Sequence, residues 1–227
     1  MSKLNYEAGK LRRPITDEVK RMVLEDLPEL ASISEDALRQ QCIDAWALAL
    51  CGSSFERVRD IPGDGYPGCF RLKRGIQCHH LRGMARIAVS LADEFKSSFP
   101  EIDIDRDIVL AGALIHDIGK PWEFDPANQD RWTTDPARTG EPSVRHSVYG
   151  VHICLTAGLP EELVHVAVGH SSEGVHIGLS LECLFIRTAD HSWWTLAAAS
   201  GLIEPASKLA PWPLFDSMVR PRKLLTE

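Results

Sequence analysis

The fold of this chain is decided by one stretch of sequence, Ile108-Val-Leu-Ala-Gly-Ala-Leu-Ile-His-Asp-Ile-Gly-Lys120. Residues 108–115 are apolar on nearly every side of a helix, which predicts a central, buried helix. His116 and Asp117 come at its C-terminal end, and Gly119 is placed to terminate it. An ionised aspartate in such surroundings is costly unless it is paired or bound to a metal. The stretch therefore predicts a buried helix that ends in metal ligands.

Histidine and aspartate recur at wide spacing on the other expected helices. Neutral imidazole and carboxylate bind divalent transition metals, and a carboxylate can also bridge two of them. A helical bundle can direct one ligand from each helix to a common point. The pattern predicts a binuclear metal centre with the ligands His80, His116, Asp117, His146, His170 and Asp190. Adjacent helix residues point about 100° apart, so the dyad can serve two metals only if it lies between them or if the helix end is distorted. Asp117 is the candidate bridge.

Two adjacent residues, His79 and His80, are candidates for the first metal ligand. His80 lies four residues before Met84 and therefore falls within the apolar stripe of its helix. His79 would point away from that stripe. We favour His80 as the ligand, with His79 as the alternative.

The rest of the sequence predicts further helices joined by irregular segments. Thr16 is the expected cap of one helix and Ser34 of the next. Two segments are expected to be irregular: 61–75, which is rich in glycine and proline, and 121–142, a long non-periodic segment whose tryptophans favour a packed lid. No segment shows the alternation of a strand, so the predicted fold class is all-α.

We expect three parts along the chain. Residues 1–75 would form an N-terminal helical extension and loop packed on the core. Residues 76–200 would form the metal-binding domain, and residues 201–227 an irregular C-terminal tail. The extension could complete the bundle, cover the pocket or form the face of a homodimer, and the sequence does not choose among these.

Composition limits the classes of function. The net charge of -7 and the pI of about 5.7 argue against binding to duplex nucleic acid or to an anionic membrane. They allow a phosphorylated substrate, because metals can supply local positive charge. None of the six cysteines forms a C-x-x-C pair, and no secretory apolar segment follows Met1. We therefore expect a cytoplasmic protein with reduced cysteines that behave as small apolar residues.

Three motifs together resemble one known family. The stretch Gly112-Ala-Leu-Ile-His-Asp-Ile-Gly-Lys120 resembles the signature of the HD-domain superfamily of metal-dependent phosphohydrolases. That family's first and last ligand helices are similar to His80-Leu-Arg-Gly-Met-Ala-Arg-Ile-Ala88 and Leu184-Phe-Ile-Arg-Thr-Ala-Asp190. The resemblance covers roughly residues 76–200 and implies an HD-domain helical bundle with an N-terminal helical extension. It also implies that one metal is held by His80, His116, Asp117 and Asp190.

The other two histidines narrow the resemblance. The pair His146 and His170 is similar to the binuclear subgroup of the superfamily, and the stretch from Val168 to Asp190 is similar to HD-type diadenosine tetraphosphate hydrolases. The cyclic-di-GMP-degrading subgroup has a Gly-Tyr-Pro element where this chain reads Ser171-Ser-Glu-Gly-Val-His176, which speaks against that activity.

The expected function is hydrolysis of a phosphoester or phosphoanhydride by a water that two divalent transition metals activate. Iron or manganese is the expected metal, with magnesium, nickel, cobalt and zinc as alternatives. The expected partner is a small phosphorylated substrate such as a nucleotide. Asp117 and Lys120 are the candidate catalytic residues, and Lys120 and Arg145 the candidate substrate-binding residues. Lys120 could equally be a solvated cation at a helix end.

Two other functions fit the same residues. Six-ligand HD sites also occur in di-iron oxygenases that resemble myo-inositol oxygenase and cleave C–C or C–P bonds with O2, and imidazole and carboxylate suit iron equally well. The chain could also be a non-catalytic nucleotide-binding regulatory module, although such a module would be expected to have lost ligands.

Overall fold

The protein is all-α, as predicted. The computed structural model describes residues 10–205, and within that range it contains α-helices, short 3-10 helices and isolated β-bridges but no strand. The α-helices are α1 (Asp17–Asp26), α2 (Asp36–Cys51), α3 (Gln77–Ser98), α4 (Arg106–Ile115), α5 (Lys120–Glu123), α6 (Pro126–Thr134), α7 (Pro136–Thr139), α8 (His146–Thr156), α9 (Glu161–Gly169) and α10 (Leu181–Ala199). Over the described range, no helix combines the length and the apolar character needed to cross a lipid bilayer.

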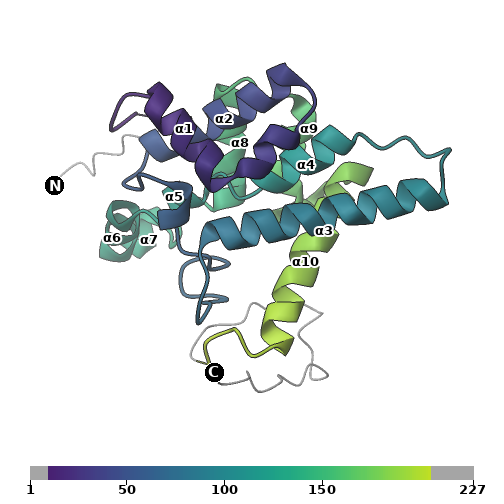
Figure 1. Cartoon of the computed structure of the whole chain (residues 1–227). Helices are drawn as coiled ribbons and strands as arrows, with labels where there is room; N and C mark the ends of the chain where they lie inside the picture. Colours follow the sequence, from purple (N-terminus) through teal and green to yellow (C-terminus); the bar gives the residue numbers. More distant parts are fainter. Residues whose placement is uncertain (1–9, 206–227) are drawn as a thin grey trace.

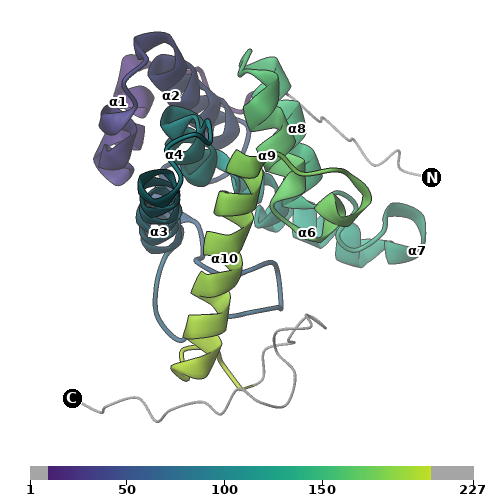
Figure 2. The same ribbon diagram turned by 90° about the vertical axis from the view of Figure 1, so that its right-hand side faces the viewer.

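Helix α4 lies at the centre of the molecule, where α2, α3, α9 and α10 contact it (Figures 1 and 2). Every residue from Ile108 to Ile115 is buried, which confirms the predicted central helix. Its N-terminus is capped by Asp105, whose carboxylate accepts a hydrogen bond from the backbone N–H of Ile108 at 3.0 Å. Gly112 leaves room for α10, because a Cβ atom there would lie 2.6 Å from Cδ1 of Ile186.

The chain makes a tight turn after α4, and this turn carries Asp117. The prediction that Gly119 terminates α4 is wrong, because the helix ends at Ile115 and Gly119 has an ordinary φ of -83° as the first residue before α5. Gly119 is needed for space instead. A Cβ atom there would lie 2.0 Å from the carbonyl oxygen of His146. The absent side chain therefore allows the first turn of α8 to approach the turn that follows α4.

Helices α1 and α2 share one hydrophobic core with the rest of the bundle. Buried side chains such as Val23 of α1 and Trp46 of α2 belong to the same cluster as those of α3, α4, α8, α9 and α10. The indole N–H of Trp46 donates to the carbonyl of Leu114 at 3.0 Å and so joins α2 to the end of α4. Thr16 caps α1 as predicted, with its hydroxyl accepting from the N–H of Val19 at 3.4 Å.

The start of α2 differs from the prediction that Ser34 caps it. Glu35 is the residue before the helix, and its side chain makes no capping bond. Asp107 of α4 instead accepts hydrogen bonds from the backbone N–H groups of Ser34 and Glu35, at 2.9 and 3.0 Å, and from the Ser34 hydroxyl. An ionised carboxylate is a stronger acceptor than a hydroxyl, so a residue distant in sequence takes the role expected of the local serine.

The segment 121–142, predicted to lack secondary structure, contains α5, α6 and α7. Pro121, Pro126 and Pro136 each occupy the first or second position of one of these helices. Proline is favoured there because its missing N–H would have no partner within the helix. The prediction was wrong because these prolines begin helices rather than interrupt them. Both tryptophans of the segment are buried, so it packs against the bundle.

The segment 61–75 is irregular, as predicted. Pro62 and Ile76 form an antiparallel bridge that closes the chain into a loop, called the 62–76 loop below. A second bridge joins Leu72 to Ile203, so the chain that follows α10 lies against this loop. The tail predicted over 201–227 is irregular from Gly201 to Pro205, and the rest of it lies outside the described residues.

All six cysteines are buried and form no disulfide within the described residues, in agreement with their expected apolar role. Burial raises the pKa of both Cys42 and Cys154 to about 12. These two thiols therefore stay protonated at neutral pH and behave as small core residues.

The Gly119→Ala substitution should destabilise the protein by about 1–3 kcal/mol or more, because the new methyl group would overlap backbone atoms of α8 that have little freedom to move. Urea unfolding followed by circular dichroism measures the change. Gly178→Ala is the matched control, since a Cβ atom at Gly178 meets nothing within 4 Å and should change stability by no more than about 0.5 kcal/mol. Equal stability of the two variants would contradict the packing argument.

Removing the Asp107 carboxylate should weaken the attachment of α2 to α4. Burial raises the pKa of Asp107, but the hydrogen bonds from Ser34 and Glu35 outweigh burial and the net shift is downward. The stabilisation is therefore present above the unfolded-state pKa and is lost as pH falls through the folded-state pKa. We expect Asp107→Ala to cost about 1 kcal/mol at pH 7 and progressively less in acid, whereas Asp103→Ala, at an exposed position, should show no such trend. Chemical denaturation at several pH values measures both.

Candidate metal centre

The structure brings together all six side chains that the sequence singled out as metal ligands. Helix α3 contributes the first, the turn after α4 the next two, the start of α8 the fourth, the residue after α9 the fifth and the middle of α10 the last. All six are buried, with at most 6% of any one of them exposed: His80, His116, Asp117, His146, His170 and Asp190. Their convergence from five helices or helix ends forms one cluster, called the metal cluster below.

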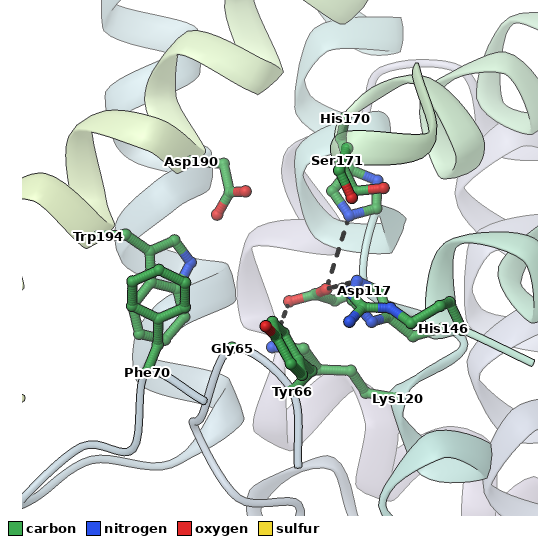
Figure 3. Close-up of a pocket in the computed structure, with 12 residues that line it drawn as sticks. Gly65, Tyr66, Phe70, Asp117, Lys120, His146, His170, Ser171, Asp190 and Trp194 are labelled. Atoms are coloured by element: carbon green, nitrogen blue, oxygen red, sulfur yellow. Dashed lines mark ion pairs between the residues drawn. The ribbon is translucent and has the colours of Figure 1, made fainter. Parts of the chain in front are cut away.

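The carboxylate of Asp117 lies at the centre of this cluster, and its two oxygens face different histidines. Figure 3 shows Asp117 with His146 and His170 beside it. Oδ2 lies 3.2 Å from Nε2 of His116 and 3.3 Å from Nε2 of His80. Oδ1 lies 3.3 Å from Nε2 of His146 and 3.8 Å from Nε2 of His170. A carboxylate that presents one oxygen to each side has the arrangement that a bridging ligand needs.

Asp190 extends the side of the cluster that Oδ2 faces. Its Oδ1 atom lies 3.4 Å from Nε2 of His80. The ligand atoms of His80, His116 and Asp190 lie within 4.8 Å of one another, and so do those of His116, Asp117 and His170. The two groups share His116, so they are adjacent parts of one site.

Helix ends orient two of the histidine rings. Nδ1 of His116 lies 2.9 Å from the carbonyl oxygen of Ala113, and Nδ1 of His170 lies 3.1 Å from that of Val166. Both carbonyls belong to the last turn of a helix, where backbone acceptors are in excess. A carbonyl on Nδ1 places the proton there and leaves Nε2 as the free ligand atom. The two rings therefore direct Nε2 towards Asp117.

Sequence reasoning missed two polar side chains that touch the metal cluster. Glu123 is fully buried on α5, and its Oε2 atom accepts the Nδ1 proton of His146. Gln77 is fully buried at the start of α3, and its Nε2 atom donates to Oδ2 of Asp117 at 2.8 Å. The available signals were an acidic residue between Trp122 and Phe124, and an amide three residues before His80 on the same helix face.

Burial and mutual charge set the protonation of the cluster. Burial alone would raise the pKa of Asp117, but His116 and Lys120 outweigh it and hold that pKa well below its usual range. Burial lowers the pKa of His80, and burial together with His116 lowers that of His170. Burial opposes protonation of His116 as well, but the Asp117 carboxylate prevails and raises its pKa. An ionised carboxylate with neutral imidazoles at His80 and His170 is the state that binds metals.

The donor set fits a divalent transition metal. One buried ligand atom of the cluster, Oδ1 of Asp190, has no hydrogen-bond partner among the described residues. Buried polar atoms without partners are uncommon, and such an atom needs an explanation such as a bound ion. Imidazole nitrogens and carboxylate oxygens suit iron, manganese and zinc alike.

A cavity of about 310 Å³ opens onto the metal cluster. Phe70 and Trp194 line one side of it, with ring centroids 5.5 Å apart (Figure 3). Tyr66 lines another side, with the guanidinium of Arg145 4.2 Å from the centre of its ring. Ser171 follows the last histidine of the cluster and adds a hydroxyl to the lining. The cavity thus joins a polar, ligand-bearing end to aromatic walls.

The two predicted substrate-binding residues both line this cavity but are already paired. Lys120 is only 1% exposed, so the interpretation as a solvated helix-end cation is wrong. Its Nζ atom contacts Asp117, Gln77 and the backbone carbonyl of Asp64. The Arg145 Nε atom lies 3.2 Å from Oε1 of Glu123 and 3.6 Å from Oε1 of Glu173. Substrate binding by Lys120 and Arg145 stays a prediction.

The neighbouring histidine lies outside the cluster. Nδ1 of His79 accepts a hydrogen bond from the backbone N–H of Ile76 at 3.4 Å, at the start of α3. His80 instead points inward, 5.3 Å from the ring of Trp194.

In a comparison with protein-family models, residues 78–192 match the HD domain. This range includes all six side chains of the metal cluster. HD domains bind divalent metals and are typical of metal-dependent hydrolases. No curated protein and no solved structure gave a significant match. The matched range covers half of the chain and contains the cluster described above, so this protein belongs to the HD-domain family.

Proposed function

We propose that the protein is a metal-dependent phosphohydrolase that cleaves a phosphoester or phosphoanhydride of a nucleotide or another small phosphorylated molecule. The observation that carries this proposal is the carboxylate of Asp117, whose two oxygens face separate histidines at the base of the cavity. It has the placement of a ligand shared by two divalent metals. Iron and manganese are the first candidates for those metals.

The residues divide naturally into two sets. One metal would be held by His80, His116 and Asp190 on the side of Oδ2, and the other by His146 and His170 on the side of Oδ1. Metals bound there would supply a water whose pKa is lowered towards 7, and hence a nucleophile at neutral pH. Asp117 keeps its ligand form because its pKa is low, so it would remain ionised throughout the neutral range.

The rest of the cavity would bind and shield the substrate. A volume of about 310 Å³ is at the small end of the range for ligand pockets, which favours a small molecule over a macromolecule. Arg145 lies on the cavity wall and can offer donors of its guanidinium to a phosphate oxygen. The hydroxyls of Ser171 and Ser172 already donate to Glu173. The aromatic walls exclude water around the reacting group.

The hydrolase is tested with protein purified without chelator. Metal content is measured first, and release of phosphate or nucleoside is then followed with nucleotides, sugar phosphates and generic phosphodiesters. We expect hydrolysis that disappears on chelation and returns with iron or manganese. His80→Ala should lose both metal and hydrolysis, whereas His79→Ala, which removes a neighbouring ring outside the cluster, should retain them.

Two results would overturn the proposal. Uptake of O2 coupled to turnover of a polyol or phosphonate would assign the site to a di-iron oxygenase. Full metal occupancy without hydrolysis of any phosphorylated compound would instead indicate a non-catalytic module.

Glu123→Gln should weaken metal binding by roughly 10- to 100-fold, because a neutral amide supports the His146 ring less well than a carboxylate does. Competition between the protein and a coloured chelator gives the affinity, and thermal melting of the metal-free protein shows whether the variant folds. Glu173→Gln is the control, since Glu173 lies 3.6 Å from Arg145 and accepts a hydrogen bond from the Ser171 hydroxyl rather than from a histidine ring of the cluster. Wild-type metal affinity in Glu123→Gln would refute the role of this carboxylate.

A further inference from the structure

Asp117 is held by two donors that lie outside the histidine set. Gln77 donates from Nε2 to Oδ2 of Asp117 at 2.8 Å, and Nζ of Lys120 lies 2.9 Å from the same oxygen. Gln77 and Lys120 are both essentially inaccessible to solvent. Two donors on one oxygen restrict rotation of the carboxylate plane, so Oδ1 remains directed towards His146 and His170.

The orientation of the Gln77 amide is itself determined by Lys120. Nζ of Lys120 donates to Oε1 of Gln77 at 3.3 Å. Since an ammonium group donates but never accepts, the amide oxygen must face Lys120 and the amide nitrogen must face Asp117. The side chains of Lys120, Gln77 and Asp117 thus form a closed ring of hydrogen bonds. Lys120 orients the Gln77 amide, and both residues orient the Asp117 carboxylate.

Lys120 also joins this ring to the wall of the cavity. Its Nζ atom donates to the backbone carbonyl of Asp64 at 2.6 Å. Asp64 belongs to the 62–76 loop, which brings Gly65, Tyr66 and Phe70 to the cavity. Contacts to Asp117, Gln77 and Asp64 account for the three donors of the ammonium group, which leaves none for a substrate phosphate.

We propose that Gln77 and Lys120 are positioning residues that orient the Asp117 carboxylate for metal binding and connect it to the 62–76 loop. This inference rests on the proposed metal-dependent function but departs from the expectation that Lys120 contacts substrate. The same ammonium group sets the direction of the central ligand and the place of the cavity wall. Gln77 orients only the Asp117 carboxylate, whereas Lys120 orients this carboxylate and also holds the 62–76 loop.

Metal affinity tests the orienting role without reference to catalysis. Gln77→Met keeps the length and approximate volume of the side chain but removes both hydrogen bonds, and we expect roughly 10- to 100-fold weaker manganese binding by chelator competition. Gln41→Met is the matched control, because Gln41 donates to the carbonyl of Gly158 away from the cluster. Gln77→Asn, which retains an amide that is too short to reach both partners, serves as the second variant if Gln77→Met does not fold.

Inorganic phosphate distinguishes positioning from substrate binding by Lys120. In manganese-saturated enzyme, Lys120→Met and Gln77→Met should both lower kcat, and the inhibition constant of inorganic phosphate should stay close to the wild-type value in both. Lys120→Met should additionally raise KM for a phosphorylated substrate with aromatic character, because the 62–76 loop loses its hydrogen bond from Nζ to Asp64 beside the cavity.

Two outcomes would overturn the inference. One is wild-type manganese affinity in a folded Gln77→Met variant. The other is a selective loss of phosphate inhibition in Lys120→Met at full metal occupancy, which would make Lys120 a phosphate ligand. If no variant and no wild-type preparation hydrolyses any phosphorylated compound, the proposed function fails, and the manganese titration still decides whether Gln77 orients Asp117.

Discussion

The buried negative charge of Asp117 is the constraint on which the rest of the structure depends. An isolated carboxylate at this depth would be strongly unfavourable, and it would become neutral rather than stay charged. Burial raises the pKa of Asp117, but His116, Lys120 and His80 together hold it low. His146, His170 and the amide of Gln77 also lie against the carboxylate. These groups come from α3, α5, α8 and the residues that follow α4 and α9. Contacts to the Asp117 carboxylate therefore join helices of the bundle in addition to the apolar core.

Helix ends give the site its preference for cations. His116 and His170 each follow the last residue of a helix, and each ring bonds to a carbonyl of that helix's final turn. The C-terminus of a helix carries partial negative charge, so two such ends near Asp117 reinforce its field. Gly119 makes this arrangement possible by allowing the first turn of α8 to pack against the turn after α4. Backbone geometry and electrostatics thus act together at the same few residues.

Much of this architecture follows from the sequence, and the exceptions have physical causes. The apolar residues before His116 predict the buried central helix because they occupy every side of that helix and leave none for polar residues. The ligand residues were identifiable because charged groups in apolar surroundings need a partner. Gln77 and Glu123 were missed because their roles come from distant contacts that no local spacing encodes. The prolines at 121, 126 and 136 were misinterpreted because the same residue both begins and breaks helices, and only its position in the element decides which.

The wide separation of the cluster residues along the chain has a consequence for biosynthesis. His80 lies on α3 and Asp190 on α10, so the nascent polypeptide leaves the ribosome with its first histidine exposed long before the last carboxylate has been made. The residues between α3 and α10 must fold before all six side chains of the cluster can come together. A metal held as proposed could meet all six side chains only after α10 has been made, so the ions present at that stage would influence which one is bound.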